Sequence, residues 1–493
     1  MTHDPIALLH RHLGHSSFRP GQEELIRAVL RGRDALGVLP TGGGKSVCYQ
    51  VPALALGGLT LVVTPLVSLM EDQVGRARAV GLRADYMSAT QGTGAKRVVL
   101  ERARAGCLDM LFVAPERLEL DGFRRAVRGM DVRLLAVDEA HCISEWGHDF
   151  RPAYRRIGSI GGELGCPTLA LTATATRAVR EDVTASLSLW RPLEVVRSFD
   201  RPNLAWSVLQ GGALSARTVR TYRLLRRSPG PAIVYAPTRR AVELVRDGLA
   251  GRGLSTEAYH AGLPGPERSR VQAAFMEGRC RVVVATNAFG MGIDKADVRS
   301  VVHIHLPGTL ESYYQEAGRA GRDESPASCV AFHDRADRRL AVSFVDRTHP
   351  STWALRKLHR RLRGLAGRDS LVRIDPGAHP AYASLFEEWL AGTGVGGLAA
   401  LERVGAVRDV PGSTEPRGTG AAAAGSQAGR LFVRRRLDLA LANRLRGHAL
   451  RGVDAVQRYA RGRGCRRQAL LGYFGEKAPA RCGNCDRCTQ RFS

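Results

Sequence analysis

The chain has 493 residues, and its 73 Lys and Arg outnumber its 47 Asp and Glu, which gives a formal net charge of +26. Hydrophobic residues make up 44% of the sequence and charged residues 24%, which excludes a globally disordered chain and a fibrous repeat. The excess of positive charge favours a polyanionic partner, nucleic acid before an anionic membrane surface. No apolar stretch is long enough to cross a bilayer, and the N-terminus lacks a signal-peptide pattern. We therefore expect no membrane association and a cytoplasmic or otherwise intracellular protein, associated with the nucleoid in a bacterium.

Short apolar runs alternate with helical patterns through two successive parts of the chain, as in doubly wound α/β sheets. The strands expected in the first part are 35–39, 59–64, 110–114, 134–137 and 168–172. After a linker at 210–213, the strands expected in the second part are 232–235, 256–259, 282–285, 301–305 and 328–332. The sequence therefore predicts two α/β lobes, residues 1–208 and 209–346, with a ligand cleft between them.

The pattern becomes mainly helical after residue 346. We expect an accessory region at 347–450 and a helical zinc-binding module at 451–493. A helix–turn–helix pattern at 381–403 is followed by strand-like runs at 404–410 and 431–433, which flank a Gly/Ala-rich loop. One hypothesis is a winged-helix-like insertion over 378–436, and the alternative is a helical spacer.

A glycine-rich turn after the first expected strand has the context of a phosphate-binding Walker A loop, although Leu39 stands at the first position where that pattern has Gly. Its residues are Thr41, Gly42, Gly43, Gly44, Lys45 and Ser46. Backbone N–H groups and the following helix N-terminus would hold the phosphates of ATP. Lys45 would reach the β- and γ-phosphates, and Ser46 would coordinate Mg²⁺. The choice of Lys is informative, because the chain has five Lys among 73 basic residues.

Charged side chains that would complete a phosphoryl-transfer site occur in both expected lobes. Asp138 and Glu139 follow the apolar run 134–137, where Asp138 would hold Mg²⁺ and Glu139 would polarise the attacking water. Arg319 and Arg322 are spaced i, i+3 in the second lobe and would place positive charge on the γ-phosphate when the cleft closes. A solvated acidic turn and a surface arginine pair are the alternatives.

Four cysteines near the C-terminus have the spacing C-x16-C-x2-C-x2-C. They are Cys465, Cys482, Cys485 and Cys488. Four thiolates with two tight C-x-x-C steps predict a closed tetrahedral Zn²⁺ site, in preference to redox chemistry.

With these motifs in order, the chain resembles the superfamily 2 helicases, and specifically the RecQ-type DNA helicases. The matching stretches are Phe18–Gln22, the 39–50 loop and helix start, 64–70, 113–118, 138–141, 171–175, 233–235, 285–294 and 315–323. The stretch 141–152 is similar to the aromatic-rich loop that couples single-stranded DNA to ATP hydrolysis in that family. The Cys465–Cys488 segment is similar to its zinc module.

The resemblance implies two RecA-like lobes and ATP-dependent 3′→5′ unwinding of single-stranded and partly duplex DNA, in repair or recombination. Gln22 would contact adenine, Arg322 would act as the arginine finger, and Arg319 would lie near the phosphates. Thr172 and Thr174 would relay the nucleotide state between the lobes. The residues implied to couple DNA to ATP hydrolysis are Trp146, His148, Phe150 and Arg151. Stacking of Trp146 and Phe150 on unpaired bases fits that role.

The chain departs from the family's usual order. Roughly a hundred residues separate the second lobe from Cys465, and five residues follow Cys488. We therefore expect no winged helix after the zinc module, and the way in which strands are separated stays open. Two alternatives to a helicase remain: an ATP-driven translocase or annealing factor, and a basic DNA-binding protein without enzymatic activity. The sequence identifies no protein partner.

Overall fold

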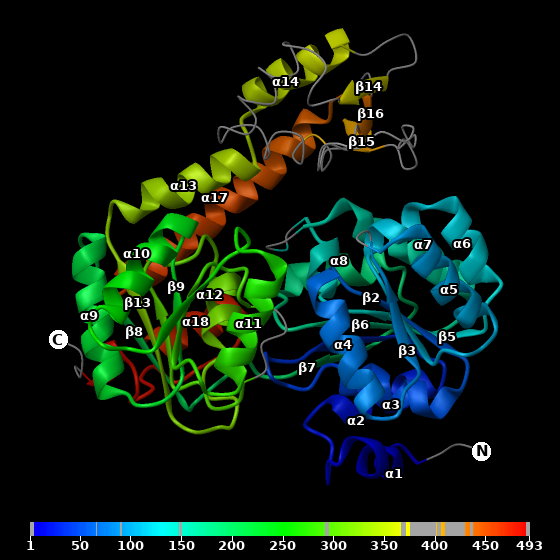
Figure 1. Cartoon of the computed structure of the whole chain (residues 1–493), viewed down its shortest axis with the longest axis horizontal. Coiled ribbons are helices and arrows are strands. Elements are labelled where there is room, and N and C mark those ends of the chain that lie inside the picture. Colours follow the sequence, from blue (N-terminus) through cyan, green and yellow to red (C-terminus); the bar gives the residue numbers. More distant parts are fainter. Residues whose placement is uncertain are drawn as a thin grey trace. The chain divides into compact units, whose positions relative to one another are not determined.

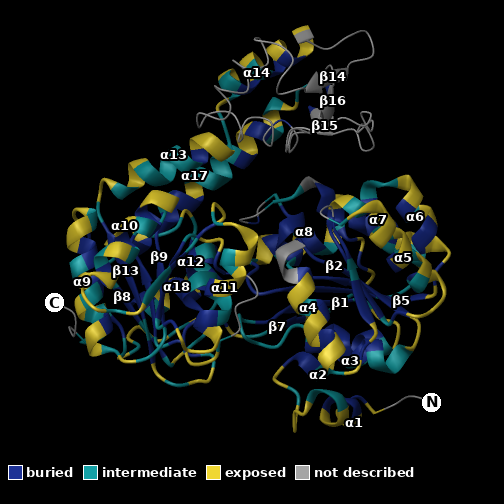
Figure 2. Ribbon diagram, viewed as in Figure 1, coloured by how far each residue is buried: buried dark blue, intermediate teal, exposed yellow. Residues whose placement is uncertain are grey.

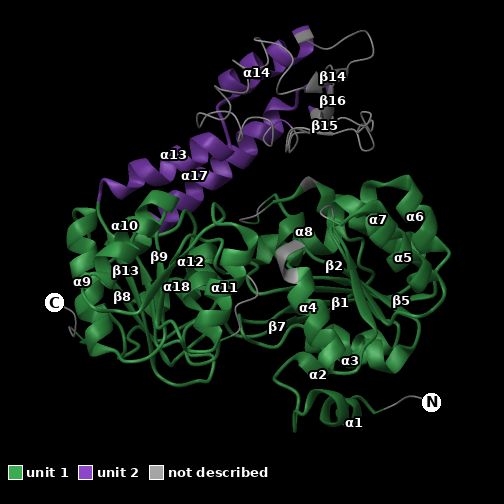
Figure 3. Cartoon of the chain, viewed as in Figure 1, with its two compact units in different colours: residues 1–334, 458–493 green, residues 335–457 purple. Residues whose placement is uncertain are grey.

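The computed structural model describes residues 4–65, 67–88, 91–145, 147, 150–290, 295–365, 371–374, 401, 406–409, 429–433 and 437–489. The chain divides into two compact units, residues 1–334 with 458–493, and residues 335–457 (Figure 3). No helix in the described ranges has both the length and the apolar composition needed to cross a bilayer.

The first lobe of unit 1 is built on a seven-stranded parallel sheet with the strand order β3-β4-β2-β5-β6-β1-β7 (Figure 1). Its strands are β1 Ala35–Val38, β2 Leu59–Val63, β3 Ala84–Met87, β4 Met110–Val113, β5 Val132–Val137, β6 Thr168–Thr172 and β7 Leu193–Val196. Its α-helices are α1 Pro5–Leu8, α2 Gln22–Leu30, α3 Val47–Leu56, α4 Val67–Ala79, α5 Thr93–Arg104, α6 Asp121–Arg128, α7 Ile157–Leu164 and α8 Arg177–Ser186. Short turns of helix lie at η1 Leu9–Leu13, η2 Pro115–Glu119, η3 Ala140–Ile143 and η4 Pro152–Arg156.

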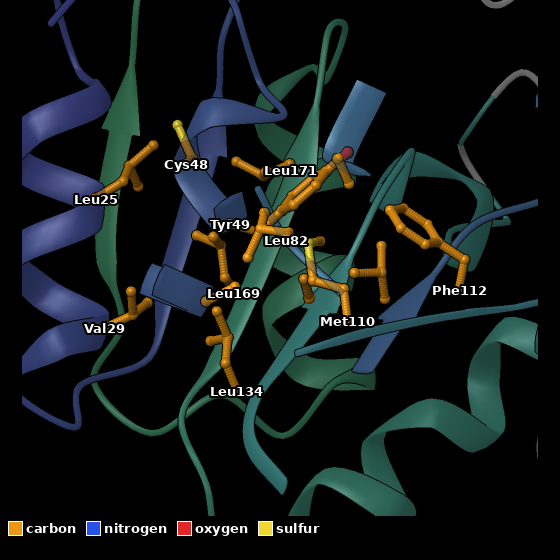
Figure 4. Close-up of a cluster of buried hydrophobic side chains, with 14 of the residues drawn as sticks. Leu25, Val29, Cys48, Tyr49, Leu82, Met110, Phe112, Leu134, Leu169 and Leu171 are labelled. Atoms are coloured by element: carbon orange, nitrogen blue, oxygen red, sulfur yellow. The ribbon is translucent and has the colours of Figure 1, made fainter. Parts of the chain in front are cut away.

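Apolar side chains from the central strands and from the helices on one face form the core of this lobe (Figure 4). Tyr49 of α3 lies among strand residues such as Leu134 and Leu169, and its ring meets Phe112 edge-on at 6.4 Å between centroids. The strands β1, β2, β4 and β6 are buried along their whole length, as expected for interior parallel strands that are covered on both faces.

The second lobe of unit 1 has a six-stranded parallel sheet with the order β10-β11-β9-β12-β13-β8. Its strands are β8 Leu204–Gln210, β9 Ala232–Tyr235, β10 Thr256–Tyr259, β11 Val282–Ala285, β12 Ser300–His303 and β13 Ala327–His333. Its helices are α9 Leu214–Arg227, α10 Arg239–Ala250, α11 Gly265–Met276 and α12 Leu310–Ala317, and the C-terminal α18 Arg466–Tyr473 and α19 Asp486–Thr489 also belong to unit 1. The predicted class of two doubly wound lobes followed by a helical, zinc-binding region is confirmed.

Strand β8 differs from the prediction. The expected lobe boundary at 208/209 falls inside this strand, and the expected linker begins at its last residue, Gln210. The strand pairs in parallel with β13, from Leu204 opposite Ala327 to Gln210 opposite His333, so it belongs to the second sheet. A boundary drawn from chain order misplaced it because its partner lies far along the sequence.

Unit 2 contains α13 Asp337–Thr348, α14 Thr352–Leu365, most of α17 Leu439–Arg461 and a small antiparallel sheet. Arg446 of α17 hydrogen-bonds the His349 carbonyl at 2.6 Å and pairs with Asp346 at 2.5 Å, which fastens α17 to the end of α13. The sheet has the order β14-β16-β15, with β14 Leu371–Ile374, β15 Val407–Asp409 and β16 Gly429–Val433.

The strands expected at 404–410 and 431–433 are thus present as β15 and β16, which pair antiparallel. The helix–turn–helix expected at 381–403 lies outside the described residues, apart from residue 401. The winged-helix interpretation of 378–436 therefore stays a prediction.

Candidate nucleotide site and zinc centre

The predicted phosphate loop connects the end of β1 to the start of α3. Gly43 N–H donates to the Pro40 carbonyl at 2.8 Å, and Val47 N–H donates to the Gly44 carbonyl at 3.1 Å, so the loop closes tightly onto the helix. Gly42 and Gly44 have φ angles of +82° and +70°, which a residue with a Cβ adopts only at a cost. This geometry exposes backbone N–H groups at a helix N-terminus, where a phosphate binds favourably.

Gln22, at the start of α2, fastens this loop. Its side-chain amide donates to the carbonyls of Gly43 and Gly44, each at 3.0 Å, and its carbonyl accepts from Arg19 N–H at 2.9 Å. The Arg19 guanidinium also donates to the Gly42 carbonyl. A Cβ at Gly44 would lie 2.5 Å from the Gln22 amide nitrogen, so the close approach of Gln22 requires glycine there.

The acidic pair lies beside the loop, because β1, β6 and β5 are successive parallel strands whose carboxyl ends share one edge of the sheet. Burial raises the pKa of the Asp138 carboxyl, and the nearby Lys45 ammonium and a hydrogen bond from Gln73 oppose that rise. Gln73 of α4 donates to Asp138 at 3.2 Å. The Glu139 carboxylate is 3.3 Å from His141 Nδ1. Glu139 has φ +48°, a left-handed backbone that non-glycine residues rarely adopt and that is concentrated at functional sites.

The two arginines of the second lobe face the same space. Arg319 and Arg322 line a cavity of about 670 Å³. The phosphate loop, Gln22, Asp138 and Glu139 line the same cavity. Arg322 passes over the loop, since a Cβ at Gly42 would lie 3.3 Å from its Cγ. Arg319 is buried and donates to the Gly290 carbonyl. Thr41 Oγ1 also faces inward, buried and without a hydrogen-bond partner among the described residues, as expected of a group that waits for a ligand.

A polar chain leads from the acidic pair to the second lobe. His141 Nδ1 lies 2.9 Å from Thr172 Oγ1, and that hydroxyl donates to the Thr174 carbonyl at 3.2 Å. The Thr174 hydroxyl then accepts a hydrogen bond from the Gln315 amide at 2.9 Å, and Gln315 belongs to α12 of the second lobe. Sequence reasoning identified the two threonines but gave His141 and Gln315 no role in this chain.

The predicted DNA-coupling residues are described only in part, because Trp146 and His148 lie outside the described residues. Arg151 donates to the Pro65 carbonyl at 2.7 Å, which ties this loop to the segment after β2. Phe150 is half-buried, and the Arg155 guanidinium lies 5.3 Å from its ring centroid. Phe150 is thus accessible in part, beside a cation.

The four predicted cysteine ligands come together at the C-terminus of unit 1. Their sulfur atoms all lie within 4.8 Å of one another, with Cys465 to Cys485 at 3.9 Å and Cys482 to Cys488 at 4.0 Å. Four sulfurs at about 2.3 Å from a central Zn²⁺ would be about 3.8 Å apart, so the cluster fits a tetrahedral zinc ion. Burial raises the pKa of the Cys482 thiol to about 12 and also raises that of Cys485, so a bound zinc ion would displace protons from these thiols.

Buried Arg466 organises this centre from α18. Its backbone N–H donates to Cys485 Sγ at 3.4 Å, and its guanidinium pairs with Asp486 at 2.9 Å and donates to the Tyr459 carbonyl at 2.5 Å. The side chain is fully buried, and these partners satisfy its charge. The sequence alone marked this residue only as part of the zinc segment.

The zinc module holds the connection between the two lobes. The Glu476 carboxylate accepts from Phe199 N–H at 2.7 Å and from the Ser198 hydroxyl at 2.8 Å, and the Phe474 ring stacks on Phe199 at 4.4 Å. Arg467 forms a two-pronged ion pair with Asp200. The segment between the lobes, residues 198–201, also contacts residues 318–321, which carry Arg319.

That second link runs through Arg201. Its guanidinium donates to the carbonyls of Gly318 at 3.3 Å, Ala320 at 2.9 Å and Gly321 at 2.7 Å, on either side of Arg319. The zinc centre and the nucleotide cavity are therefore joined through residues 198–201 and 318–321.

Two parallel-sheet lobes with a phosphate loop on the first and paired arginines on the second define the core of a superfamily 2 helicase. Three family models match in order: DEAD/DEAH box helicase at 19–182, helicase conserved C-terminal domain at 216–324, and RecQ zinc-binding at 433–489. The probable ATP-dependent DNA helicase RecS of Bacillus subtilis is 40% identical over 340 residues, covering 68% of each chain. The chain belongs to the RecQ-type helicase family.

Other relatives agree with this assignment. The ATP-dependent DNA helicase RecQ of Pasteurella multocida is 45% identical over 331 residues, which cover 67% of this chain and 52% of the relative. The match thus spans about half the length of that relative. Among solved structures, the helicase Lhr of Mycobacterium smegmatis, bound to single-stranded DNA and AMP-PNP, has a TM-score of 0.55 at 19% identity, over 88% of this chain and 61% of that one. This structural likeness concerns the fold.

Proposed function

We propose that the chain is an ATP-driven DNA helicase that moves 3′→5′ along a single strand and unwinds DNA in repair or recombination, inside the cell and at the nucleoid in a bacterium. The observation that carries the proposal is the cavity in which the phosphate loop and the Asp138–Glu139 pair of one lobe face Arg319 and Arg322 of the other. A site divided in this way is complete only when the lobes approach, so nucleotide turnover changes their separation.

The chemistry follows from the positions of these side chains. Lys45 binds the β- and γ-phosphates. Gln22 contacts adenine and, through its hydrogen bonds to Gly43 and Gly44, also holds the phosphate loop in place. Glu139 orients a water molecule and accepts its proton as the water oxygen attacks the γ-phosphorus and the bond to the β–γ bridging oxygen breaks. Arg322 stabilises the charge that develops on the transferred group, with Arg319 beside it.

Ser46 and Asp138 offer the hydroxyl and carboxylate oxygens that Mg²⁺ prefers, and both line the cavity. These residues would hold the ion, which supplies neutralising charge to the phosphates. The burial of Asp138 is consistent with a carboxylate that serves a cation.

The DNA strand is proposed to contact the loop that contains Trp146, His148, Phe150 and Arg151, where aromatic rings stack on unpaired bases. Relatives named DNA helicases, and the neighbour Lhr bound to single-stranded DNA, support DNA as the substrate. Arg151 ties this loop to Pro65. His141, at the start of the 141–152 stretch, lies 3.3 Å from the carboxylate of Glu139, which lines the nucleotide cavity.

Lys45→Ala tests the proposal, with the exposed Lys477→Ala as its matched control. Lys45→Ala should abolish DNA-stimulated ATPase and strand displacement while DNA binding persists, and Lys477→Ala should retain all three. Tailed duplexes test direction, since a 3′-tailed substrate should be unwound and a 5′-tailed one should not. Unwinding by Lys45→Ala would overturn the mechanism, and ATP turnover without strand separation by the unaltered protein would identify a translocase instead.

A further inference from the structure

Helix α14 of unit 2 carries an unusual concentration of positive charge. Residues 352–365 contain five Lys and Arg and no Asp or Glu. Elsewhere, helical arginines commonly pair with a carboxylate one turn away, as Arg97 does with Glu101 at 3.2 Å and Arg177 with Glu181 at 2.9 Å. Within the described part of the chain, Arg356, Arg360 and Arg363 form no ion pair, so these three charges are open to an external anion.

The charged residues share one face of the helix. Leu355, His359 and Leu362 are buried at i, i+4 and i+7, and they fix the inward side of α14. Exposed positions recur along α14 (Figure 2). By helical spacing, the exposed residues Trp353, Arg356, Lys357, Arg360 and Arg363 fall in one connected sector, which runs from the edge of the buried stripe to the side opposite it. The outward face is therefore a continuous cationic strip with one aromatic ring.

Trp353 is the unexpected member of this face. Its side chain is 71% exposed, and the Lys357 ammonium lies 5.4 Å from its ring centroid. Most of the ring surface is therefore open to a ligand. A ring with cations one turn away can stack on an unpaired base while those cations meet the flanking phosphates.

We propose that this face of α14 is a binding surface for single-stranded DNA, separate from the 141–152 loop. The inference rests on the proposed function. It gives unit 2 a contact with the DNA strand in addition to that of the 141–152 loop. A membrane surface is a poorer fit, because an interfacial helix inserts a whole apolar face, and the apolar face of α14 is already buried. Charge complementarity and the exposed ring together favour a polyanion with unpaired bases.

The experiment measures binding of a fluorescent single-stranded oligonucleotide to the full chain across a salt series. Trp353→Ala should weaken binding about tenfold, since stacking is worth about 1–3 kcal/mol per base. Trp353→Phe should restore most of the loss. The double variant Arg356→Gln/Arg360→Gln should lower the slope of log K against log salt by about 1.4, two contacts at about 0.7 each.

Matched controls come from the rest of the chain. Trp190 is 75% exposed and has Arg191 over its ring at 5.3 Å, so Trp190→Ala removes an equivalent residue outside α14. The pair Arg97→Gln/Arg177→Gln removes two surface charges that already have carboxylate partners. Both controls should leave the affinity and the salt slope within about twofold of the unaltered protein, in keeping with exposed positions.

Two further measurements distinguish an error in the α14 surface from an error in the proposed function. ATPase activity at saturating oligonucleotide should be unchanged in the α14 variants, because the nucleotide cavity is intact. Unchanged oligonucleotide affinity together with normal ATPase would overturn the α14 surface and leave the proposed function standing. Binding to anionic phospholipid vesicles that depends on Trp353, without any effect on oligonucleotide binding, would also overturn it. An unaltered protein without ATPase would instead contradict the proposed function.

Discussion

Gln315 of the second lobe donates a hydrogen bond to the Thr174 hydroxyl of the first lobe at 2.9 Å. Thr174 is buried, and its neighbour Thr172 contacts His141, which lies beside the proposed water-activating Glu139. The Gln315 amide thus contacts the end of a polar chain that begins beside the proposed catalytic base, Glu139. A movement of α12 would therefore be transmitted to Glu139 through Thr174, Thr172 and His141.

Removal of this contact should slow hydrolysis without preventing ATP binding. Thr174→Val keeps the shape and loses the hydroxyl, so DNA-stimulated kcat should fall about fivefold, the equivalent of about 1 kcal/mol for one hydrogen bond. The KM for ATP should change less than twofold. Thr174→Ser retains the hydroxyl and should stay near the unaltered rate. Equal rates in the valine and serine variants would show that this hydrogen bond does not couple α12 to ATP hydrolysis.

Gly44 should prove intolerant of a methyl group for a specific reason. A Cβ there would lie 2.5 Å from the Gln22 amide nitrogen, and φ is +70°. Gly44→Ala should therefore push Gln22 away and weaken ATP binding more than tenfold, a loss of more than about 1.4 kcal/mol. Nucleotide titration by fluorescence would measure it.

Gly165→Ala serves as the control, because Gly165 has φ +64° with nothing within 4 Å of its Cβ position. It should lose about 1 kcal/mol of stability from its backbone conformation and bind nucleotide normally. If both alanine variants bound ATP equally well, the contact with Gln22 would have no part in recognition.

Loss of one thiol should empty the zinc centre. Cys485→Ser removes a buried ligand that also accepts the Arg466 N–H, so metal analysis should find zinc at well below the one ion per chain expected for the unaltered protein. The thermal unfolding midpoint should fall with it. Cys107→Ser, at an exposed cysteine outside the cluster, should retain zinc and stability. Full zinc occupancy in Cys485→Ser would contradict four-thiolate ligation.

Glu476 should stabilise the chain well beyond an ordinary surface carboxylate. Glu476→Ala leaves the Phe199 N–H without its partner, which should cost about 1–3 kcal/mol in the free energy of unfolding by urea. Glu277→Ala breaks only the exposed pair with Arg279 and should cost at most about 1 kcal/mol. A similar loss in both variants would mean that the zinc module does not fasten residues 198–200.

The interior strands were predictable because a strand buried on both faces needs a nearly unbroken apolar run, as in Met110–Val113 and Val282–Ala285. The edge strands β3 and β7 were not expected. β7 has only Val195 buried among its four residues, so its sequence shows no such run. Pairing with β1, which no local pattern encodes, makes it a strand.

The nucleotide cavity brings together Lys45, Asp138, Glu139 and both arginines that were singled out in the sequence, because each lies in a short motif with its own chemistry. Gln73 was missed, since a glutamine on an ordinary helix has no distinguishing local pattern. The contacts of Glu476 and Arg467 with residues 198–200 were also missed. They join positions more than 260 residues apart, and only the folded chain brings them together.

The position of β8 has a consequence during synthesis. Leu204 to Gln210 emerge first among the strands of their sheet, yet the strand that pairs with them runs from Ala327 to His333. Until those residues leave the ribosome, Leu204 and Trp206, both buried in the finished protein, lack the neighbour that covers them. A nascent chain halted before Ala327 would therefore expose an unpaired strand edge, which favours aggregation and recruits chaperones.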